Sequence, residues 1–273
     1  MKHQTANIKF LSPRSSKSPS PLLIYLPGMD GTGKLFHRQA EKLGNFFAIR
    51  CLSIPSHDQS NWHDLADQTI GLIKQELESH HGSSVYLCGE SFGGCLALKV
   101  ALKAPELIEK MILVNPASSF EKRPWLGLGV QLNQWMPNFL YQSSTVGFLP
   151  FLGSLGRIEK EDSKALLKAM QSLPQEVVSW RLALLRDFQI NRETLKRLKQ
   201  PILMLASDQD RLLPSVAEGQ QLMSYFPQGN LTILPNSGHA CLLETEVNLA
   251  EVLRKNDFLP SPQIHSSCSS NAA

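Results

Sequence analysis

A short glycine-rich motif in the first half of the chain could carry a nucleophile. Residues 89–93 read Gly-Glu-Ser-Phe-Gly, between an apolar run that ends at Cys88 and a segment rich in Ala and Leu. Where such a motif joins a strand to a helix, the serine sits on a strained turn that exposes its hydroxyl. The glycines on either side leave out Cβ atoms that would collide. The same pattern also occurs in ordinary glycine turns, but with these neighbours it predicts that Ser91 is a nucleophile.

A serine hydroxyl needs two partners at neutral pH: a histidine that accepts its proton, and a buried carboxylate that fixes the tautomer of that histidine. His239 follows the last apolar run, in the turn Asn-Ser-Gly-His, and is the predicted base. Asp208 and Asp210 both follow the apolar run 202–206. We favour Asp210 as the acid because it stands directly before the short segment Arg-Leu-Leu-Pro at 211–214, and Asp208 is the alternative. The order Ser, Asp, His is that of α/β-hydrolases.

The other histidines lack a comparable position after a strand, and we interpret them as solvated or structural. They are His3, His37, His57, His63, His80, His81 and His265. Of these, only His37 has a position that could border a pocket beside the site. A surface loop is the alternative interpretation for His239.

Acyl transfer also requires two backbone N–H groups for the oxyanion of the tetrahedral intermediate. In α/β-hydrolases one comes from the residue after the nucleophile and the other from the loop after an early strand. Phe92 is therefore the first predicted donor. The second is expected in the loop Pro-Gly-Met-Asp-Gly-Thr-Gly at 27–33, through Met29, because Gly28 lets the backbone come close to a substrate.

Other kinds of site are disfavoured. The loop 27–33 continues with Lys34 and Leu35, so it lacks the hydroxyl residue of a phosphate-binding P-loop. Neither a His-Glu-x-x-His motif nor a Cys/His cluster occurs at metal-ligand spacing, so no cofactor and no metal are predicted. The formal net charge is +3 with Lys and Arg scattered, which indicates no nucleic-acid partner. The five cysteines are far apart and odd in number, which indicates no disulfide framework.

The elements that must position these residues alternate along the chain from residue 21 onward. Short apolar runs that end at Gly, Pro or a polar turn are typical of buried strands, and the segments between them have helical spacing. The predicted strands are Leu22–Leu26, Phe46–Ile54, Val85–Cys88, Lys110–Val114, Ile202–Ala206 and Leu231–Leu234, and the predicted helices include Trp62–Ser79 with Asn61 as N-cap, Ser91–Lys103 and Leu242–Arg254. This pattern predicts an α/β fold with a mostly parallel central sheet and helices on both faces.

The stretch from 119 to 200 interrupts this alternation. It is first rich in Trp, Phe, Gly and Pro, and its later part has helical spacing over Glu159–Met170, Gln175–Phe188 and Arg192–Lys199. Because it falls between two strands, we expect a helical lid over the carboxyl edge of the sheet. The expected organisation is one hydrolase domain at 21–258, with a core of 21–118 and 201–258 and a lid of 119–200, between a flexible segment 1–20 and a disordered tail 259–273.

Five motifs suggest a narrower group. They read Leu-Pro-Gly-Met-Asp-Gly-Thr-Gly (26–33), Gly-Glu-Ser-Phe-Gly-Gly-Cys-Leu-Ala-Leu (89–98), Leu-Val-Asn-Pro-Ala (113–117), Leu-Leu-Pro-Ser (212–215) and Gly-His-Ala-Cys-Leu-Leu-Glu (238–244). Together they resemble the hydrolase portion of the plant phytyl ester synthase and diacylglycerol acyltransferase family. The resemblance implies a long-chain, apolar substrate and places the nucleophile, acid and base on Ser91, Asp210 and His239.

The chain departs from that family in two respects. Glu90 stands where family members often carry Asp. Plant members usually continue into an acyltransferase-like domain with a His-x-x-x-x-Asp motif, and no His in this chain is followed by Asp at that spacing. We therefore expect hydrolysis or transacylation at the serine.

The leading hypothesis is a serine hydrolase that cleaves carboxylic esters of lipid-like, long-chain acyl substrates through an acyl-enzyme. One alternative is an acyltransferase or thioesterase that moves acyl groups to phytol, diacylglycerol or water, and another is a non-catalytic ligand-binding protein of the same fold. The aromatic residues Trp125, Trp135, Phe139, Phe148 and Phe151 could line the substrate site or pack the lid onto the domain.

We expect a cytoplasmic protein with at most peripheral membrane contact, since no signal peptide and no apolar run of about 20 residues occur.

Overall fold

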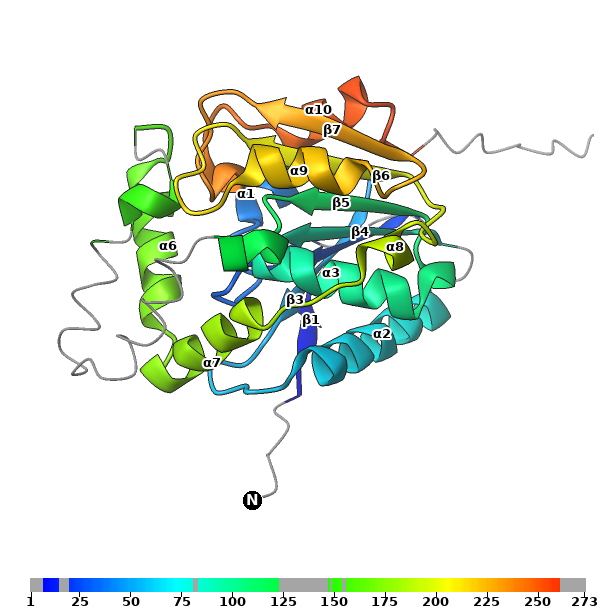
Figure 1. The fold of residues 1–273 in the computed structure, drawn as a ribbon, viewed down its shortest axis with the longest axis horizontal. Coiled ribbons are helices and arrows are strands. Elements are labelled where there is room, and N and C mark those ends of the chain that lie inside the picture. Colours follow the sequence, from blue (N-terminus) through cyan, green and yellow to red (C-terminus); the bar gives the residue numbers. More distant parts are fainter. Residues whose placement is uncertain are drawn as a thin grey trace, which may run out of the picture.

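A seven-stranded sheet forms the centre of the molecule (Figure 1). The computed structural model describes residues 7–14, 20–80, 83–122, 147, 149–153 and 156–260 of the 273-residue chain. The strand order is β1-β3-β2-β4-β5-β6-β7, in which β1 pairs antiparallel to β3 and the other neighbours are parallel. The strands are β1 (Lys9–Leu11), β2 (Leu22–Leu26), β3 (Ala48–Ser53), β4 (Val85–Glu90), β5 (Lys110–Val114), β6 (Ile202–Ser207) and β7 (Gly229–Leu234). The predicted mostly parallel sheet is confirmed.

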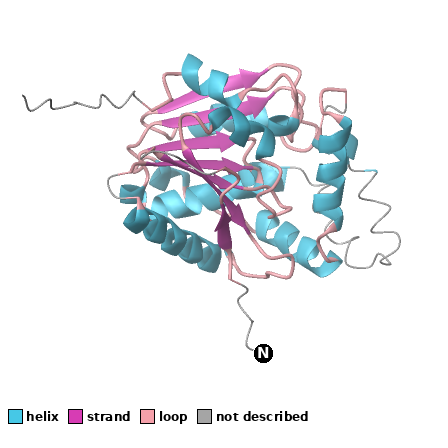
Figure 2. Cartoon of the chain, turned by 180° about the vertical axis from the view of Figure 1, so that it is seen from behind, coloured by secondary structure: helices cyan, strands magenta, loops and turns pink. Residues whose placement is uncertain are grey.

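The central strands are continuous apolar runs because helices cover both of their faces. Every residue of β2 and β6 is buried, whereas β7 at the edge has only its last residue buried. The helices α2 (Trp62–Ser79), α3 (Phe92–Lys103) and α9 (Ser215–Met223) pack on one face, and α1 (His37–Leu43) and α10 (Leu249–Lys255) on the other. Figure 2 shows the strands between these two layers from behind.

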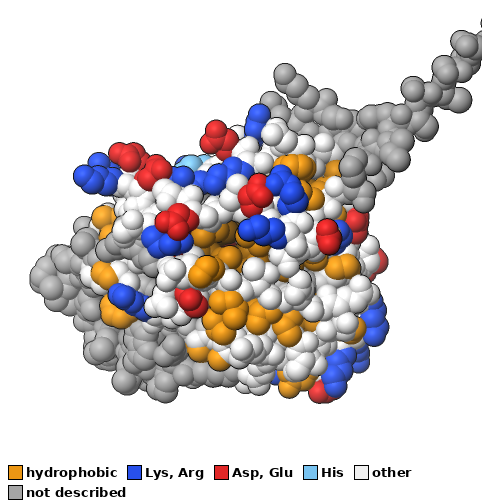
Figure 3. Space-filling model, turned by 90° about the horizontal axis from the view of Figure 1, so that it is seen from above, with side chains coloured by type: hydrophobic (Ala, Val, Ile, Leu, Met, Phe, Trp, Pro, Cys, Tyr) orange, Lys and Arg blue, Asp and Glu red, His pale blue; other side chains and the backbone are white. Residues whose placement is uncertain are grey.

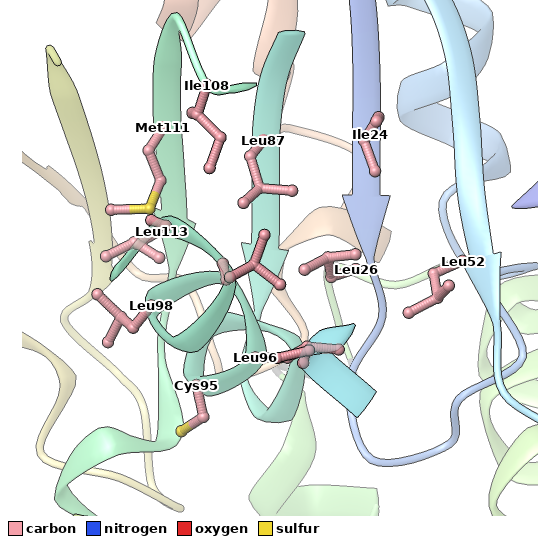
Figure 4. Close-up of a cluster of buried hydrophobic side chains, with 14 of the residues drawn as sticks. Ile24, Leu26, Leu52, Leu87, Cys95, Leu96, Leu98, Ile108, Met111 and Leu113 are labelled. Carbon is pink, nitrogen blue, oxygen red and sulfur yellow. The ribbon is translucent and has the colours of Figure 1, made fainter. Parts of the chain in front are cut away.

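Helix α3 is the element that ties the nucleophile turn to the sheet. Its Cys95, Leu96 and Leu98 are fully buried against side chains that include Leu26 and Leu113 (Figure 4). Since burial stabilises by about 25 cal/mol per Å² of apolar surface, this contact fixes the start of α3 firmly. The neighbouring helix α2 begins as predicted at Asn61, whose side chain accepts from the Asp64 N–H at 3.0 Å.

The segment between β5 and β6 contributes separate helical pieces. They are η2 (Ala117–Lys122), α6 (Lys160–Gln171), α7 (Gln175–Arg186) and α8 (Arg192–Leu195). Figure 1 shows α6 and α7 beside the carboxyl ends of the parallel strands. Of the five aromatic residues predicted to line or pack the lid, Phe151 is 43% exposed. The other four, Trp125, Trp135, Phe139 and Phe148, lie outside the described residues, as does the tail from 261 onward.

Two expectations about the ends of the domain are wrong. Residues 1–20 were expected to be flexible, but Lys9–Leu11 form the edge strand β1. The predicted helix Leu242–Arg254 is instead a short 3-10 turn, η3 (Cys241–Leu243), followed by α10. The break occurs because Glu244 is fully buried and bonds to the Gly238 N–H, while Asn248 caps the new helix through the N–H groups of residues 250 and 251.

The surface carries charges of both signs. On the face drawn in Figure 3, Lys and Arg side chains lie among Asp and Glu side chains over the upper part, and apolar side chains gather across the middle. Among the helices that the structure describes, none combines the length and the apolar character needed to cross a membrane.

Candidate active site

Ser91 occupies a strained turn between β4 and α3. Its φ is +53° and its ψ is −113°, a conformation that non-glycine residues rarely adopt. The backbone holds it there, because the Ser91 N–H donates to the Val114 carbonyl at 2.9 Å and the Ser91 carbonyl accepts from Gly94 and Ala117 at 2.9 and 3.1 Å. Such over-determined strain is what a nucleophile elbow requires to present the hydroxyl.

The two glycines that flank Ser91 are needed for close packing. A Cβ atom added at Gly89 would lie 2.4 Å from the carbonyl oxygen of Gly93, and one added at Gly93 would lie 2.0 Å from that of Leu26. Both contacts are with backbone atoms, which cannot rotate away. The steric reason given for the motif therefore holds at both positions.

Replacing Gly93 by alanine is expected to lower the free energy of unfolding by about 3 kcal/mol, because overpacking against a backbone carbonyl forces β2 and α3 apart. Chemical denaturation measures the change. Gly71 on α2 is the matched control, since a Cβ there would meet nothing within 4 Å. Gly71→Ala should raise stability by about 0.5–1 kcal/mol through helix propensity. A Gly93→Ala protein as stable as the native one would contradict the packing argument.

His239 stands between the serine and an aspartate. Its Nε2 lies 2.8 Å from Ser91 Oγ and its Nδ1 lies 2.8 Å from Asp210 Oδ2. The side chains of His239 and Asp210 are 5% and 1% exposed. Asp208, the alternative acid, is exposed and its backbone N–H donates to the Leu234 carbonyl. The structure thus brings Asp210, rather than Asp208, to the histidine.

The Asp210 carboxylate is held by its own turn as well as by His239. One oxygen accepts from the N–H groups of Leu212 and Leu213, each at 2.9 Å, and the other accepts from the Ser215 hydroxyl at 2.5 Å. Burial alone would raise the pKa of Asp210, but the charge of His239 and these hydrogen bonds outweigh it and lower the pKa. The carboxylate is therefore charged at neutral pH and oriented toward the imidazole.

A second carboxyl group, that of Glu90, acts on His239 from the elbow. Removal from water raises the pKa of Glu90 to about 7, although the Tyr25 hydroxyl donates to it and His239 opposes the rise. Burial lowers the pKa of His239, but the charges of Asp210 and Glu90 together raise it above its usual value. Glu90 has therefore an electrostatic effect on the histidine that the sequence did not reveal.

Replacing Glu90 by glutamine is expected to shift the acid limb of the kcat/KM profile to lower pH. Only the neutral imidazole accepts a proton, so activity rises as pH passes upward through the pKa of His239. Glu90 carries its charge mainly above its own pKa of about 7, so its replacement lowers the pKa of His239 chiefly in the upper part of the acid limb, and activity persists at somewhat lower pH. The exposed Glu106, at η1 (Pro105–Leu107), is the control, and Glu106→Gln should leave the profile in place. An unchanged acid limb in Glu90→Gln would rule out the electrostatic effect.

Two buried residues that sequence reasoning missed hold the turn of His239. The Asn115 amide nitrogen donates to the His239 carbonyl at 2.8 Å and to the Ser207 hydroxyl at 2.9 Å, and its oxygen accepts from the Ser207 N–H at 2.8 Å. On the other side, Glu244 accepts from the Gly238 N–H at 2.7 Å. Both residues lie in the motifs that carry the family resemblance. Their contacts could not be derived from spacing.

The two predicted oxyanion donors lie next to the elbow. Phe92 is the first residue of α3, where an N–H group has no partner inside the helix. The loop 27–33 passes Ser91 closely, since a Cβ added at Gly28 would lie 3.9 Å from the Ser91 Cβ. Met29 follows in the same loop and packs against the core. Phe92 and the loop that carries Met29 therefore lie beside Ser91, and their role as oxyanion donors stays a prediction.

Among the described residues, no other histidine is hydrogen-bonded to Ser91, Asp210 or His239, and His3, His81 and His265 lie outside the described residues. His37, which was expected to border a pocket, has a side chain 51% exposed, and its Nε2 lies 2.8 Å from Asp162 on α6. It therefore links α1 to α6. His63 faces the carboxylate of Asp67 within α2, and His80, the residue after α2, faces that of Glu76. Within the part of the chain that the structure describes, no three His, Cys, Asp or Glu residues are grouped so as to hold a metal ion.

Comparisons with known proteins agree with this architecture. The family described as "Serine aminopeptidase, S33" matches residues 55–246. Phytyl ester synthase 1, chloroplastic, of Arabidopsis thaliana is 30% identical over 86% of this chain, which spans only 36% of the plant protein. The pimeloyl-[acyl-carrier protein] methyl ester esterase of Nitrosomonas europaea is 26% identical over 82% of this chain and 90% of its own length.

Solved structures show the same fold at lower identity. A thermophilic esterase from Thermogutta terrifontis superposes with a TM-score of 0.71 at 18% identity, over 93% of this chain and 94% of the esterase. This likeness confirms the predicted α/β-hydrolase fold. Because the family match covers well over half of the chain, the chain belongs to the α/β-hydrolase family described as "Serine aminopeptidase, S33".

Proposed function

We propose that this protein is a serine hydrolase that cleaves carboxylic esters through an acyl-enzyme on Ser91. The observation that carries the proposal is the pair of 2.8 Å distances that joins Ser91, His239 and Asp210 in the order a triad requires. The strained backbone at Ser91 and the charged Asp210 carboxylate support it.

The proposed reaction has two steps. In the first, His239 Nε2 takes the proton of Ser91 Oγ as the oxygen bonds to the ester carbonyl carbon, and then gives this proton to the departing alcohol. In the second, His239 takes a proton from water as the water oxygen attacks the acyl carbon, and then returns this proton to Ser91 Oγ as the acyl–Oγ bond breaks, which releases the acid and free Ser91. The N–H groups of Met29 and Phe92 are the proposed donors to the oxyanion in both steps.

We propose lipid-like, long-chain acyl esters as the substrates. The phytyl ester synthase of A. thaliana supports a long-chain substrate by its name, and the 30% identity extends over most of this chain. The segment 119–200, which we propose as a lid, would cover the acyl group at the carboxyl ends of the strands. We propose that a cytoplasmic protein meets such substrates by peripheral contact with a membrane.

Transfer of the acyl group to phytol, diacylglycerol or another acceptor is the second candidate function. The same acyl-enzyme would serve, with an alcohol in place of water in the second step. The likeness to a protein named as an ester synthase favours this candidate, while the likeness to proteins named as methyl ester esterases favours hydrolysis. A binding protein without turnover is the third candidate.

One set of assays separates these candidates. The purified protein is given p-nitrophenyl butyrate and p-nitrophenyl palmitate, and then a radiolabelled palmitoyl donor with phytol present. Hydrolase function predicts higher kcat/KM for the palmitate and label in free palmitic acid. Equal turnover of the two esters would overturn the long-chain preference, and label in phytyl palmitate would establish transfer. An absence of both turnover and serine labelling by a fluorophosphonate would favour the binding protein.

A further inference from the structure

A buried arginine of α7 contacts the loop that carries Met29. Arg181 is 2% exposed, and its Nη1 donates to the Met29 carbonyl at 2.7 Å while its Nη2 donates to the Pro55 carbonyl at 3.2 Å. These partners lie 152 and 126 positions earlier in the chain. One side chain therefore connects α7 to the loops that follow β2 and β3.

The loop is shaped around this guanidinium group. Gly31 has a φ of +69°, and a Cβ at this position would lie 2.6 Å from Arg181 Nη1. Burial lowers the pKa of Arg181, and the nearby carboxylates of Asp58 and Asp30 oppose the change. An arginine remains protonated under such conditions because its usual pKa is above 12. A permanent cation thus lies against the backbone of the loop.

The contact restricts the backbone of Met29. The Met29 side chain also packs beside the apolar cluster of α7 that contains Val177 and Val178. With its side chain packed and its carbonyl held by a charge-assisted hydrogen bond, Met29 has little freedom to rotate about its backbone. The Met29 N–H belongs to the preceding peptide group, whose Gly28 carbonyl accepts from the Gly31 N–H at 3.0 Å, so the peptide groups on both sides of Met29 are held.

We propose that Arg181 is a positioning residue that keeps the Met29 N–H directed at the oxyanion. This inference rests on the proposed function, because it needs an oxyanion beside Ser91. Arg181 touches no reacting atom. It acts through its hydrogen bond to the Met29 carbonyl. Helix α7 therefore helps to position an oxyanion donor, in addition to packing beside the site.

A purely structural role, in which Arg181 only anchors α7, predicts a different outcome. Two other side chains anchor this helix independently of the loop 27–33. Trp180 Nε1 donates to the Ser60 carbonyl at 3.1 Å, and Trp62 Nε1 donates to the Leu184 carbonyl at 2.9 Å. Trp180→Phe therefore removes an anchor of α7 next to Arg181 without touching Met29, and it serves as the matched control.

The test measures the rate constant for phosphonylation of Ser91 by a fluorophosphonate, together with kcat, KM and thermal midpoint. Arg181→Gln is expected to slow phosphonylation and kcat by about 10–100-fold with KM within about 3-fold, since misdirection of one oxyanion donor weakens the transition state alone. Arg181→Lys keeps the charge and one donor and should recover part of the rate. Trp180→Phe should lower the thermal midpoint but leave the rate within about 2-fold.

The outcomes separate the inference from the function on which it rests. Rapid labelling of the native protein with unchanged labelling of folded Arg181→Gln would overturn the inference and leave the proposed function standing. If Arg181→Gln fails to fold, Arg181→Met, which keeps the length of the side chain but has no donor, takes its place, and unchanged labelling of folded Arg181→Met would overturn the inference in the same way. If the phosphonylation rate constant falls in step with the thermal midpoint in all three variants, the role of Arg181 is structural only. A folded native protein that is not labelled would overturn both.

Discussion

Replacing Ser91 by alanine is expected to abolish fluorophosphonate labelling and to lower kcat by about 10⁶-fold. The hydroxyl is the atom that forms the acyl-enzyme, and no other hydroxyl lies within hydrogen-bond distance of His239 Nε2 among the described residues. The strained turn does not depend on the side chain, because the Val114, Gly94 and Ala117 contacts of Ser91 are all made by its backbone. The variant should therefore fold normally.

The measurement is intact-protein mass after labelling, followed by single-turnover ester cleavage. Ser224→Ala provides the control, since Ser224 only donates to the Gln221 carbonyl at the end of α9. The control should label and turn over as the native protein does. Label on another residue of Ser91→Ala, or turnover that persists within tenfold, would mean that a different nucleophile does the chemistry.

The core of the fold could be predicted because its signals are local. Central strands are apolar runs that end at turn residues, and this holds for β2, β4, β5 and β6. The elements β1 and α1 gave no such signal. Strand β1 has only three residues, one exposed and two half-buried, and α1 is a polar helix of seven residues. It packs through Gln39, whose amide bonds to the carbonyls of Leu242 and Val247 more than 200 positions away.

The candidate site also contains some residues that the sequence predicts and others that only the structure reveals. Ser91, Asp210 and His239 were found because each follows a strand within a short motif, and the segment 211–214 favoured Asp210 over Asp208. Asn115, Glu244 and Arg181 were not found as site residues. Their roles depend on contacts across the fold, such as the hydrogen bond from Asn115 to the His239 carbonyl, 124 positions away. No spacing rule within a single sequence contains that information.

Replacing Asp210 by asparagine is expected to lower kcat by about 10⁴-fold while leaving the fold intact. The asparagine oxygen can still accept from the N–H groups of Leu212 and Leu213, so the turn before α9 keeps its shape. An amide cannot supply the negative charge that raises the pKa of His239, and it favours the wrong imidazole tautomer.

Asp208→Asn is the matched control for this prediction. It changes the same chemical group two residues away, on an exposed side chain, and should keep kcat within about 2-fold of the native value. Burst kinetics with p-nitrophenyl esters would locate the defect, because a neutral residue 210 slows proton removal from Ser91 and so acylation itself. Loss of activity in Asp208→Asn with retention in Asp210→Asn would mean that the acid in the working enzyme is Asp208. The turn after β6 would then have to rearrange when substrate binds.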